Sequence, residues 1–378
     1  MEPLTVLAIG DPHFKVSNPR ETAGMTAAIL DIAHIRKPDI IVLLGDILDR
    51  HESIHVDPLK RANRFIADLA AIAPVWVMIG NHDRKNERVH LTDEHPFTAL
   101  SVWGKNGSNL NPVTIVDKVV LTVIKGHILV LVPYVSPGRF VEALNTLERP
   151  STNAELPTWE AATVIFAHQE FAGAQMGPVQ STKGDVWDYT APYVVSGHIH
   201  DYQELQPNIL YTGTPIQHAF GDREDKSISW FIFDSPLVRQ HTRLQLNLPR
   251  KRLVKLTVSE IDGYEADLAH DLKIIISASA GEVKAILKHP KIVLWKAKGA
   301  KVVFKTINAS NNSPIFQSNA PPSFSRLLSE RVQDNPRLAT LCTELFGKQV
   351  IADITPIINI VLPGSNLTPV AIQINRTS

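Results

Sequence analysis

The most constraining feature of this sequence is a series of short, nearly continuous apolar runs along its first 235 residues. Each run has the length of a strand and is rich in Val, Ile and Leu, which is typical of strands buried on both faces of a sheet. Two of the intervals between them, Glu21–Ile35 and Asp57–Ile72, carry apolar residues at helical spacing. This alternation predicts an α/β layered domain. The expected strands are Leu4–Ile9, Ile40–Leu44, Val75–Ile79, Ile128–Val132, Thr163–Ala167, Tyr193–Val195 and Ser227–Phe233.

Length and composition are those of a folded protein with more than one domain. The chain has 378 residues, and most domains span about 100–200 residues. Hydrophobic residues make up 44% and charged residues 20%, a balance that excludes a largely disordered chain. The single cysteine, Cys342, excludes a disulfide framework and a cysteine-rich zinc site. The sequence shows no signal-peptide pattern and no apolar run of ~20 residues, so we expect a soluble, cytoplasmic protein without membrane contact.

A second, smaller unit is expected to follow the first. Residues 1–235 form the large domain, with a boundary near Ser235–Pro236. Residues 236–307 are predicted to be a smaller α/β capping domain, residues 308–322 a linker rich in Asn, Ser and Pro, and residues 323–378 a C-terminal helical segment. Within the smaller domain we expect a helix at Glu282–Leu287 and strands at Arg252–Val258, Lys273–Ala278, near Ile292–Trp295 and at Lys301–Lys305.

Five short polar motifs follow expected strands of the large domain. In α/β folds ligands bind outside the carboxyl ends of the strands, so position alone gathers these motifs in one place. They supply Asp, Asn and five His, the ligand set of zinc, manganese or iron. One ion does not need so many ligands. The set therefore predicts two divalent cations, ~3.5–4 Å apart, that share a carboxylate. The motifs are Asp11-Pro-His13, Gly45-Asp46-Ile-Leu-Asp49, Gly80-Asn81-His82-Asp83, Ala167-His168-Gln169 and Gly197-His198-Ile-His200.

Each motif taken alone has a simpler interpretation. Asp-x-His at a strand end is commonly a cap, Gly-Asp and Gly-Asn-His-Asp are turn chemistry, and a lone histidine such as His168 is more often a hydrogen-bonded core residue. Five motifs in succession, each at an expected strand end, favour the two-cation site over coincidence. His51, His55 and His218 also lie near the motifs, and for them we expect surface or structural roles.

The order of these motifs resembles that of the calcineurin-like metallophosphoesterases. This resemblance implies a layered αββα sandwich and the hydrolysis of phosphoesters. It also implies that Asp49 pairs with His82 and that His82 protonates or stabilises the leaving oxygen. The implied ligands are Asp11, His13, Asp46 and His200 for one ion, and Asp46, Asn81, His168 and His198 for the other.

The sequence beyond the last motif resembles one branch of that superfamily, the SbcD and meiotic-recombination-eleven DNA nucleases. Gln203 follows the Gly-His-x-His motif, Leu210–Ile216 matches the family's Tyr-x-Gly-Ser-Pro strand with Thr214 in place of Ser, and Asp271–Lys305 resembles its capping domain. The resemblance implies a manganese-dependent 3′-to-5′ exonuclease on double-stranded DNA with endonuclease activity on single strands, acting in repair, recombination or replication. It also implies a homodimer bound to an SbcC-type ABC ATPase. The helices expected within 324–346 either dock on that partner or pack on the chain's own core.

Charge is unevenly distributed in a way that suits a DNA substrate. The net formal charge is zero, yet from Leu237 to Lys305 there are 14 Lys or Arg against 6 Asp or Glu, about +8. The rest of the chain, with 24 against 32, carries about −8. A charge run is usually a solvated face, but beside a phosphodiesterase site it favours contact with a nucleic-acid backbone. The candidate DNA-binding residues are Arg250, Lys251, Arg252, Lys296, Lys298 and Lys301.

Two other functions stay open at this point. A phosphodiesterase or phosphatase for small substrates would use the same metal ligands and would not need the basic region. A non-catalytic scaffold on a decayed phosphoesterase fold would have lost ligands, and none is missing from the five motifs.

Overall fold

The apolar runs form the central strands of two six-stranded sheets in the computed structural model, which describes residues 2–51, 53–86, 89–102, 110–147, 157–235 and 239–307. In the first sheet β1 to β4 are parallel, and β13 and β14 extend the sheet in antiparallel pairing beyond β1. The strand order is β14 (Arg239–Leu244), β13 (Ile228–Phe233), β1 (Leu4–Ile9), β2 (Ile40–Leu43), β3 (Val75–Met78) and β4 (Val113–Val116).

The second sheet also has a parallel core of four strands, and each of its edge strands is antiparallel to its neighbour. The strand order is β11 (Gln203–Gln206), β12 (Ile209–Tyr211), β10 (Val194–Ser196), β7 (Val164–Ala167), β6 (His127–Val132) and β5 (Val120–Ile124).

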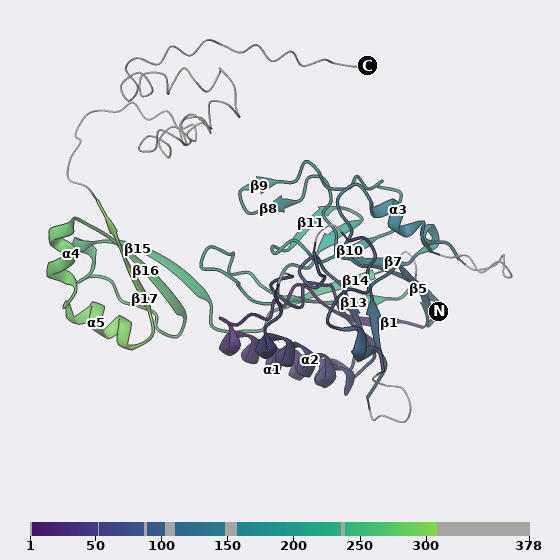
Figure 1. Cartoon of the computed structure of the whole chain (residues 1–378), viewed down its shortest axis with the longest axis horizontal. Coiled ribbons are helices and arrows are strands. Elements are labelled where there is room, and N and C mark those ends of the chain that lie inside the picture. Colours follow the sequence, from purple (N-terminus) through teal and green to yellow (C-terminus); the bar gives the residue numbers. More distant parts are fainter. Residues whose placement is uncertain are drawn as a thin grey trace, which may run out of the picture. The chain divides into compact units, whose positions relative to one another are not determined.

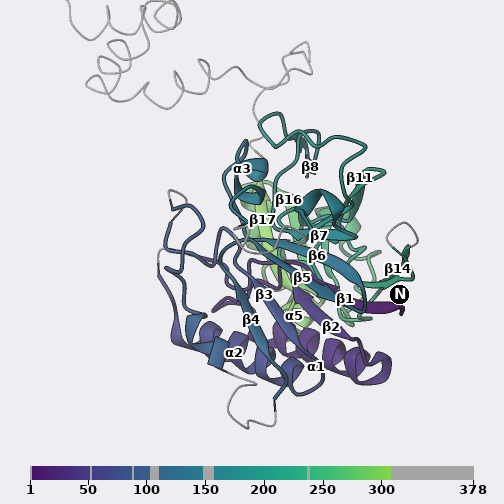
Figure 2. The ribbon, with the colours of Figure 1, turned by 90° about the vertical axis from the view of Figure 1, so that its right-hand side faces the viewer.

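The two sheets pack face to face, with helices on the outer faces. Helices α1 (Pro19–Arg36) and α2 (Val56–Ala70) lie side by side on the first sheet, and α3 (Phe140–Leu144) lies on the opposite side of the sandwich (Figures 1 and 2). Strand β1 shows why its sequence is apolar throughout. Leu7 and Ile9 pack against the helices, while Val6 and Ala8 pack against the second sheet. The described residues thus confirm the layered αββα sandwich.

All seven expected strands and both expected helices of the large domain are present, but several strands were not predicted. Strand β14 reads Arg-Gln-His-Thr-Arg-Leu and is mostly exposed at a sheet edge, so it has no apolar signal. It lies beyond position 235 and still belongs to the first sheet. The remaining short elements are the hairpin β8 (Gln175–Met176) and β9 (Val179–Gln180) and the 3₁₀ turns Thr98–Val102, Trp159–Ala161 and Val258–Glu260.

The smaller unit is a three-stranded parallel sheet with two helices on one face (Figure 1). The strand expected near Ile292–Trp295 is wrong, because these residues lie in helix α5. A four-residue apolar run does not distinguish strand from helix. Pro290 at the first helical turn and His289, whose side chain accepts from Lys291 N, start the helix. The elements are β15 (Lys251–Thr257), β16 (Asp271–Ala278), α4 (Ala280–Ile286), α5 (Pro290–Ala297) and β17 (Lys301–Thr306).

The predicted linker 308–322 and the helical segment 323–378 lie outside the described residues. Within the described ranges, no helix combines the length and the apolar character needed to cross a bilayer.

Candidate metal centre

Side chains from both sheets meet at one end of the sandwich. They follow the carboxyl ends of β1, β2 and β3 in the first sheet and of β7 and β10 in the second. Four of them have the left-handed backbone that non-glycine residues rarely adopt: Asp11 (φ 36°), His13 (44°), Asp46 (48°) and His198 (76°). Such backbone costs about 1–3 kcal/mol per residue and tends to cluster at functional sites, where the surrounding structure imposes it.

One group of ligand atoms comes from Asp11, His13 and His200, which lie within 4.8 Å of one another. Asp11 and His13 are buried, whereas His200 is exposed. The Nε2 atoms of His13 and His200 are 3.2 Å apart, so their lone pairs converge on one point. Asp11 Oδ2 is buried without a hydrogen-bond partner among the described residues. A divalent cation would satisfy all three groups at once, so the donor set fits a metal.

A second group comes from Asp46, His168 and His198, whose ligand atoms also lie within 4.8 Å of one another. The amide oxygen of Asn81 lies between the two imidazoles, 3.1 Å from His168 Nε2 and 3.0 Å from His198 Nδ1. This set of carboxylate, amide and imidazole donors also suits a divalent cation.

Asp46 lies between the two groups and faces each with a different oxygen. Its Oδ2 is 3.8 Å from His13 Nε2, and its Oδ1 is 3.4 Å from His168 Nε2. A carboxylate in this position can hold two cations together. The structure therefore brings all seven predicted ligands into two adjoining groups, with Asp46 common to both.

Backbone carbonyls fix which nitrogen of each buried histidine is available. His168 Nδ1 donates to Leu44 O at 2.6 Å, which orients the ring so that Nε2 faces Asp46. His13 Nδ1 donates to Leu48 O at 3.2 Å and likewise directs Nε2 into the site. Such outer contacts orient imidazole ligands and raise their basicity.

Burial sets the protonation of the site when no cation is bound. It lowers the pKa of His13 to about 3 and that of His198 below its ordinary value, so both imidazoles are neutral, as metal binding requires. Burial also raises the pKa of Asp11 to about 8, despite the opposing charge of His168. For Asp46, burial is outweighed by His168, which holds the carboxyl pKa well below its usual range. Cation binding would therefore displace a proton from Asp11.

Two glycines allow the strands to approach this closely. Gly45 has φ 99°, and a β-carbon there would overlap His168 Nδ1. A β-carbon at Gly80 would overlap Asp46 Oδ1. Glycine is thus needed before both Asp46 and Asn81 for steric reasons.

His82 is at the site, but the expected pairing of Asp49 with His82 is wrong. His82 Nε2 is 3.9 Å from Asp46 Oδ2, and its Nδ1 has no hydrogen-bond partner among the described residues. Asp49 instead binds Lys15 Nζ at 2.9 Å and lies 3.7 Å from His13 Nδ1. Lys15, which belongs to none of the five motifs, supplies the nearer partner.

Other residues around the centre were not predicted. The Glu170 carboxylate lies 3.9 Å from His198 Nε2, the nitrogen opposite the ligand atom, and can orient that ring. Lys226 Nζ donates to the His200 carbonyl at 2.7 Å. His218 packs edge-on against His13 and donates to Asp11 O at 3.0 Å, so it has the structural role expected of it. A charged residue two positions after a strand-end histidine is the only sequence signal for Glu170.

The predicted DNA-binding residues fall into separate groups. Ion pairs within the chain neutralise the first three: Glu224 with Arg250 and Arg252 at 3.1 and 3.3 Å, and Glu21 with Lys251 at 2.8 Å. Their contact with DNA stays a prediction, and they offer less free positive charge than their number indicates. The other three are exposed and make no ion pair with a described residue: Lys296 on α5, Lys298 just after α5, and Lys301 on β17.

Known proteins are similar to this chain in sequence. The family described as calcineurin-like phosphoesterase matches residues 4–202. A relative from Invertebrate iridescent virus 3, provisionally named phosphoesterase 078R, is 36% identical over 353 residues, which cover 91% of this chain and 97% of that protein. Another from Invertebrate iridescent virus 6, provisionally named phosphoesterase 244L, is 37% identical over 294 residues, 76% of this chain and 99% of that protein.

We expect the stability of the metal-free protein to fall as pH rises from about 6.5 to 9. In the folded state Asp11 and His168 hold protons up to about pH 8 and about 9, whereas their ordinary pKa values are 3.8 and 6.5. The folded state thus binds more protons than the unfolded state in this window. Calorimetric Tm values in chelator would check this. The slope should be shallower in Asp11→Asn, and a flat or rising wild-type curve would contradict the protonation scheme.

Gly80→Ala should abolish metal binding, because the added methyl group displaces Asp46. Titration calorimetry with manganese would measure the loss, which we expect to exceed tenfold in affinity. Gly281→Ala is the matched control, since a β-carbon there meets nothing within 4 Å. It should leave metal binding unchanged and stabilise α4 by up to about 1 kcal/mol. Normal metal affinity in Gly80→Ala would show that Asp46 is not held as described.

Proposed function

The chain belongs to the calcineurin-like phosphoesterases, and we propose that it is a nuclease that hydrolyses phosphodiester bonds of DNA with two divalent cations, most suitably manganese. The phosphoesterase activity follows from the family and the two ligand groups. The choice of DNA is supported by one observation, a lysine-rich open face on the three-stranded sheet.

In this proposal each residue of the site has a defined role. Bound cations would neutralise the charge of a phosphodiester and make hydroxide available near neutral pH. The cleft above the ligands has a volume of about 360 Å³, and His82 lines it with 35% of its side chain exposed. His82 would donate a hydrogen bond or proton to the leaving oxygen. One ion would be held by Asp11, His13, Asp46 and His200, and the other by Asp46, Asn81, His168 and His198.

The open face of the three-stranded sheet is the feature that favours a polyanionic substrate. Lys273 of β16 lies opposite Lys301 of β17 on one side and Leu253 of β15 on the other. Alternate residues of the three strands therefore share this face. The other face is covered by α4 and α5, against which Leu272, Ile274 and Ile276 pack. The lysine face carries Lys255, Lys273, Lys301 and Lys305, with Leu253, Ile275 and Val303 between them. None of the four lysines makes an ion pair with a described residue.

One end of the lysine face lies next to the catalytic cleft. Lys301 Nζ is 5.5 Å from the centre of the Phe220 ring, and the next two residues, Gly221 and Asp222, line the cleft. A DNA backbone on the lysine face would thus lead toward the ligand groups. Contacts of this kind position DNA without reading its sequence, so we expect little sequence preference.

The proposal includes the activities and partners expected from the resemblance to SbcD. These are 3′-to-5′ exonuclease activity on double strands, endonuclease activity on single strands, a homodimer, and an SbcC-type ABC ATPase bound through the C-terminal segment. The side chains of Lys296, on α5, and Lys298, just after it, offer a second, separate contact for DNA.

Asp46→Ala should lose both metal binding and cleavage, whereas His82→Gln should keep the metals and lose cleavage about 10²–10⁴-fold, the usual contribution of a general acid. End-labelled linear duplex DNA with manganese measures the rate, and calorimetry measures the metal. Wild-type protein that cleaves bis-p-nitrophenyl phosphate but leaves DNA intact would instead indicate a small-substrate phosphodiesterase. Full activity of His82→Gln would remove its proposed role.

Replacing Lys255, Lys273 and Lys305 together by Gln should weaken DNA binding and lower the slope of log affinity against log salt by about 3, because each phosphate contact contributes about 0.9. Fluorescence anisotropy at several salt concentrations measures both quantities. The matched control replaces three exposed lysines of the sandwich, Lys37, Lys60 and Lys118, by Gln. An equal loss in the control, or an unchanged slope in the test variant, would exclude the lysine face as the DNA-binding surface.

A further inference from the structure

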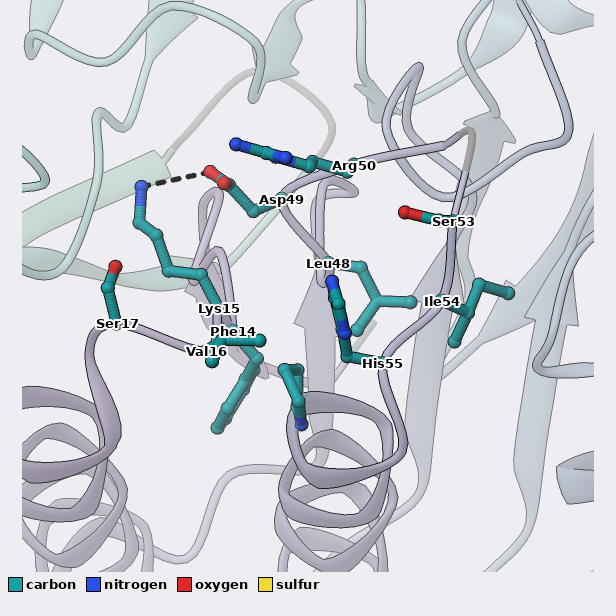
Figure 3. A pocket seen from close by; sticks show the side chains of 11 residues that line it. Phe14, Lys15, Val16, Ser17, Leu48, Asp49, Arg50, Ser53, Ile54 and His55 are labelled. Atoms are coloured by element: carbon teal, nitrogen blue, oxygen red, sulfur yellow. Dashed lines mark hydrogen bonds and ion pairs between the residues drawn. The ribbon is translucent and has the colours of Figure 1, made fainter.

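A second pocket, with a volume of about 260 Å³, adjoins the metal centre (Figure 3). It is built by the segments that follow β1 and β2, the two strands that also deliver Asp11 and Asp46. None of the proposed metal ligands lines it. The lining residues used below are Phe14, Lys15, Val16, Asp49, Arg50 and Ile54.

Asp49 and His13 connect the pocket to the metal centre. Asp49 lines the pocket and lies 3.7 Å from His13 Nδ1, behind the proposed ligand atom of that ring. On the other side, the His51 ring centre is 6.1 Å from that of His82, which lines the cleft. The pocket thus lies behind the His13 ring, next to the proposed metal ligands.

The walls of the pocket combine exposed apolar side chains with cations. Val16 and Ile54 are 57% and 49% exposed, although Phe14 beneath them is buried. In Figure 3 the charged ends of Lys15, Asp49 and Arg50 lie along one rim, and apolar side chains lie below. Arg50 makes no ion pair with any described residue. Apolar surface rimmed by charge next to a reaction centre is typical of ligand contact rather than of a plain protein surface.

We propose that this pocket holds the base of the nucleotide next to the scissile phosphate, while Arg50 contacts the adjoining phosphate. The inference rests on the proposed nuclease function. The bases are the flat, apolar parts of DNA, so they are the groups that can cover Phe14, Val16 and Ile54. A volume of about 260 Å³ lies below the ~300–1,000 Å³ of ordinary small-molecule sites and suits one base rather than a larger group.

A base in this pocket is separated from its neighbours in the helical stack. Unpairing and unstacking cost a few kcal/mol in a duplex and least where the strand is already single or frayed. The pocket therefore favours cleavage at single strands and loose ends, and it acts on any base because apolar contact does not distinguish among them.

The test compares oligonucleotides that carry either a normal base or a tetrahydrofuran abasic residue on each side of the cleaved bond. For the wild type with manganese, removal of the base on one side should slow cleavage about tenfold. Val16→Ser/Ile54→Ser should be about tenfold slower on the normal strand and much less affected on the abasic strand, because both changes remove the same contact. Val186→Ser, at an 84% exposed position outside the pocket lining, is the control and should match the wild type on both strands.

The outcomes separate this proposal from the nuclease function itself. Two results would overturn the base pocket and leave the nuclease function standing. One is that the wild type cleaves normal and abasic strands at equal rates. The other is that the double variant loses as much rate on the abasic strand as on the normal strand. No cleavage of any strand, together with cleavage of bis-p-nitrophenyl phosphate, would overturn both. An unchanged Tm in the double variant establishes that a lower rate is not caused by unfolding.

Discussion

The contact between His168 and the segment after β2 is the interaction on which the rest of the site depends. His168 ends a strand of the second sheet, yet its Nδ1 donates to Leu44 O of the first sheet at 2.6 Å, and its Nε2 faces Asp46 at 3.4 Å. The missing side chain of Gly45 makes room for this imidazole. One buried ring therefore sets the spacing between the two sheets at their carboxyl ends, and through Asp46 it joins the two ligand groups.

Charge at this junction is balanced only in part by the protein. Burial keeps His13 and His198 neutral and keeps a proton on Asp11, while Asp46 and His168 hold opposite charges. Left-handed backbone at Asp11, His13, Asp46 and His198 adds strain that the surrounding strands impose. The converging lone pairs of the ligand atoms and the unpartnered oxygen of Asp11 raise the free energy of this buried site. Divalent cations would offset that cost. Metal binding and folding are thus coupled at the same atoms.

The same architecture explains how one phosphoesterase centre could serve a long substrate. The sandwich ends in a cleft lined by His82, with an apolar pocket on the β1 and β2 side and Phe220 on the other. The parallel three-stranded sheet covers one face with helices and leaves the other to Lys255, Lys273, Lys301 and Lys305. The proposals for DNA backbone and base contacts both arise from these surfaces, which small phosphoesters would not need.

Local patterns in the sequence determined the buried strands and the residues that follow them. Strands such as β1 and β7 are apolar on both faces wherever they pack, and the motif residues sit at their ends by chain connectivity alone. Exposed or short elements escaped prediction, since β14 lies at an edge with a polar sequence and the run at Ile292–Trp295 fits either a strand or a helix. Only the tertiary structure decided that Asp49 pairs with Lys15. The same holds for the ion pairs of Glu224 with Arg250 and Arg252. It holds too for the face that Lys255 and Lys273 share with Lys301. These outcomes depend on distances between segments far apart in the chain, and residue type and local spacing do not encode such distances.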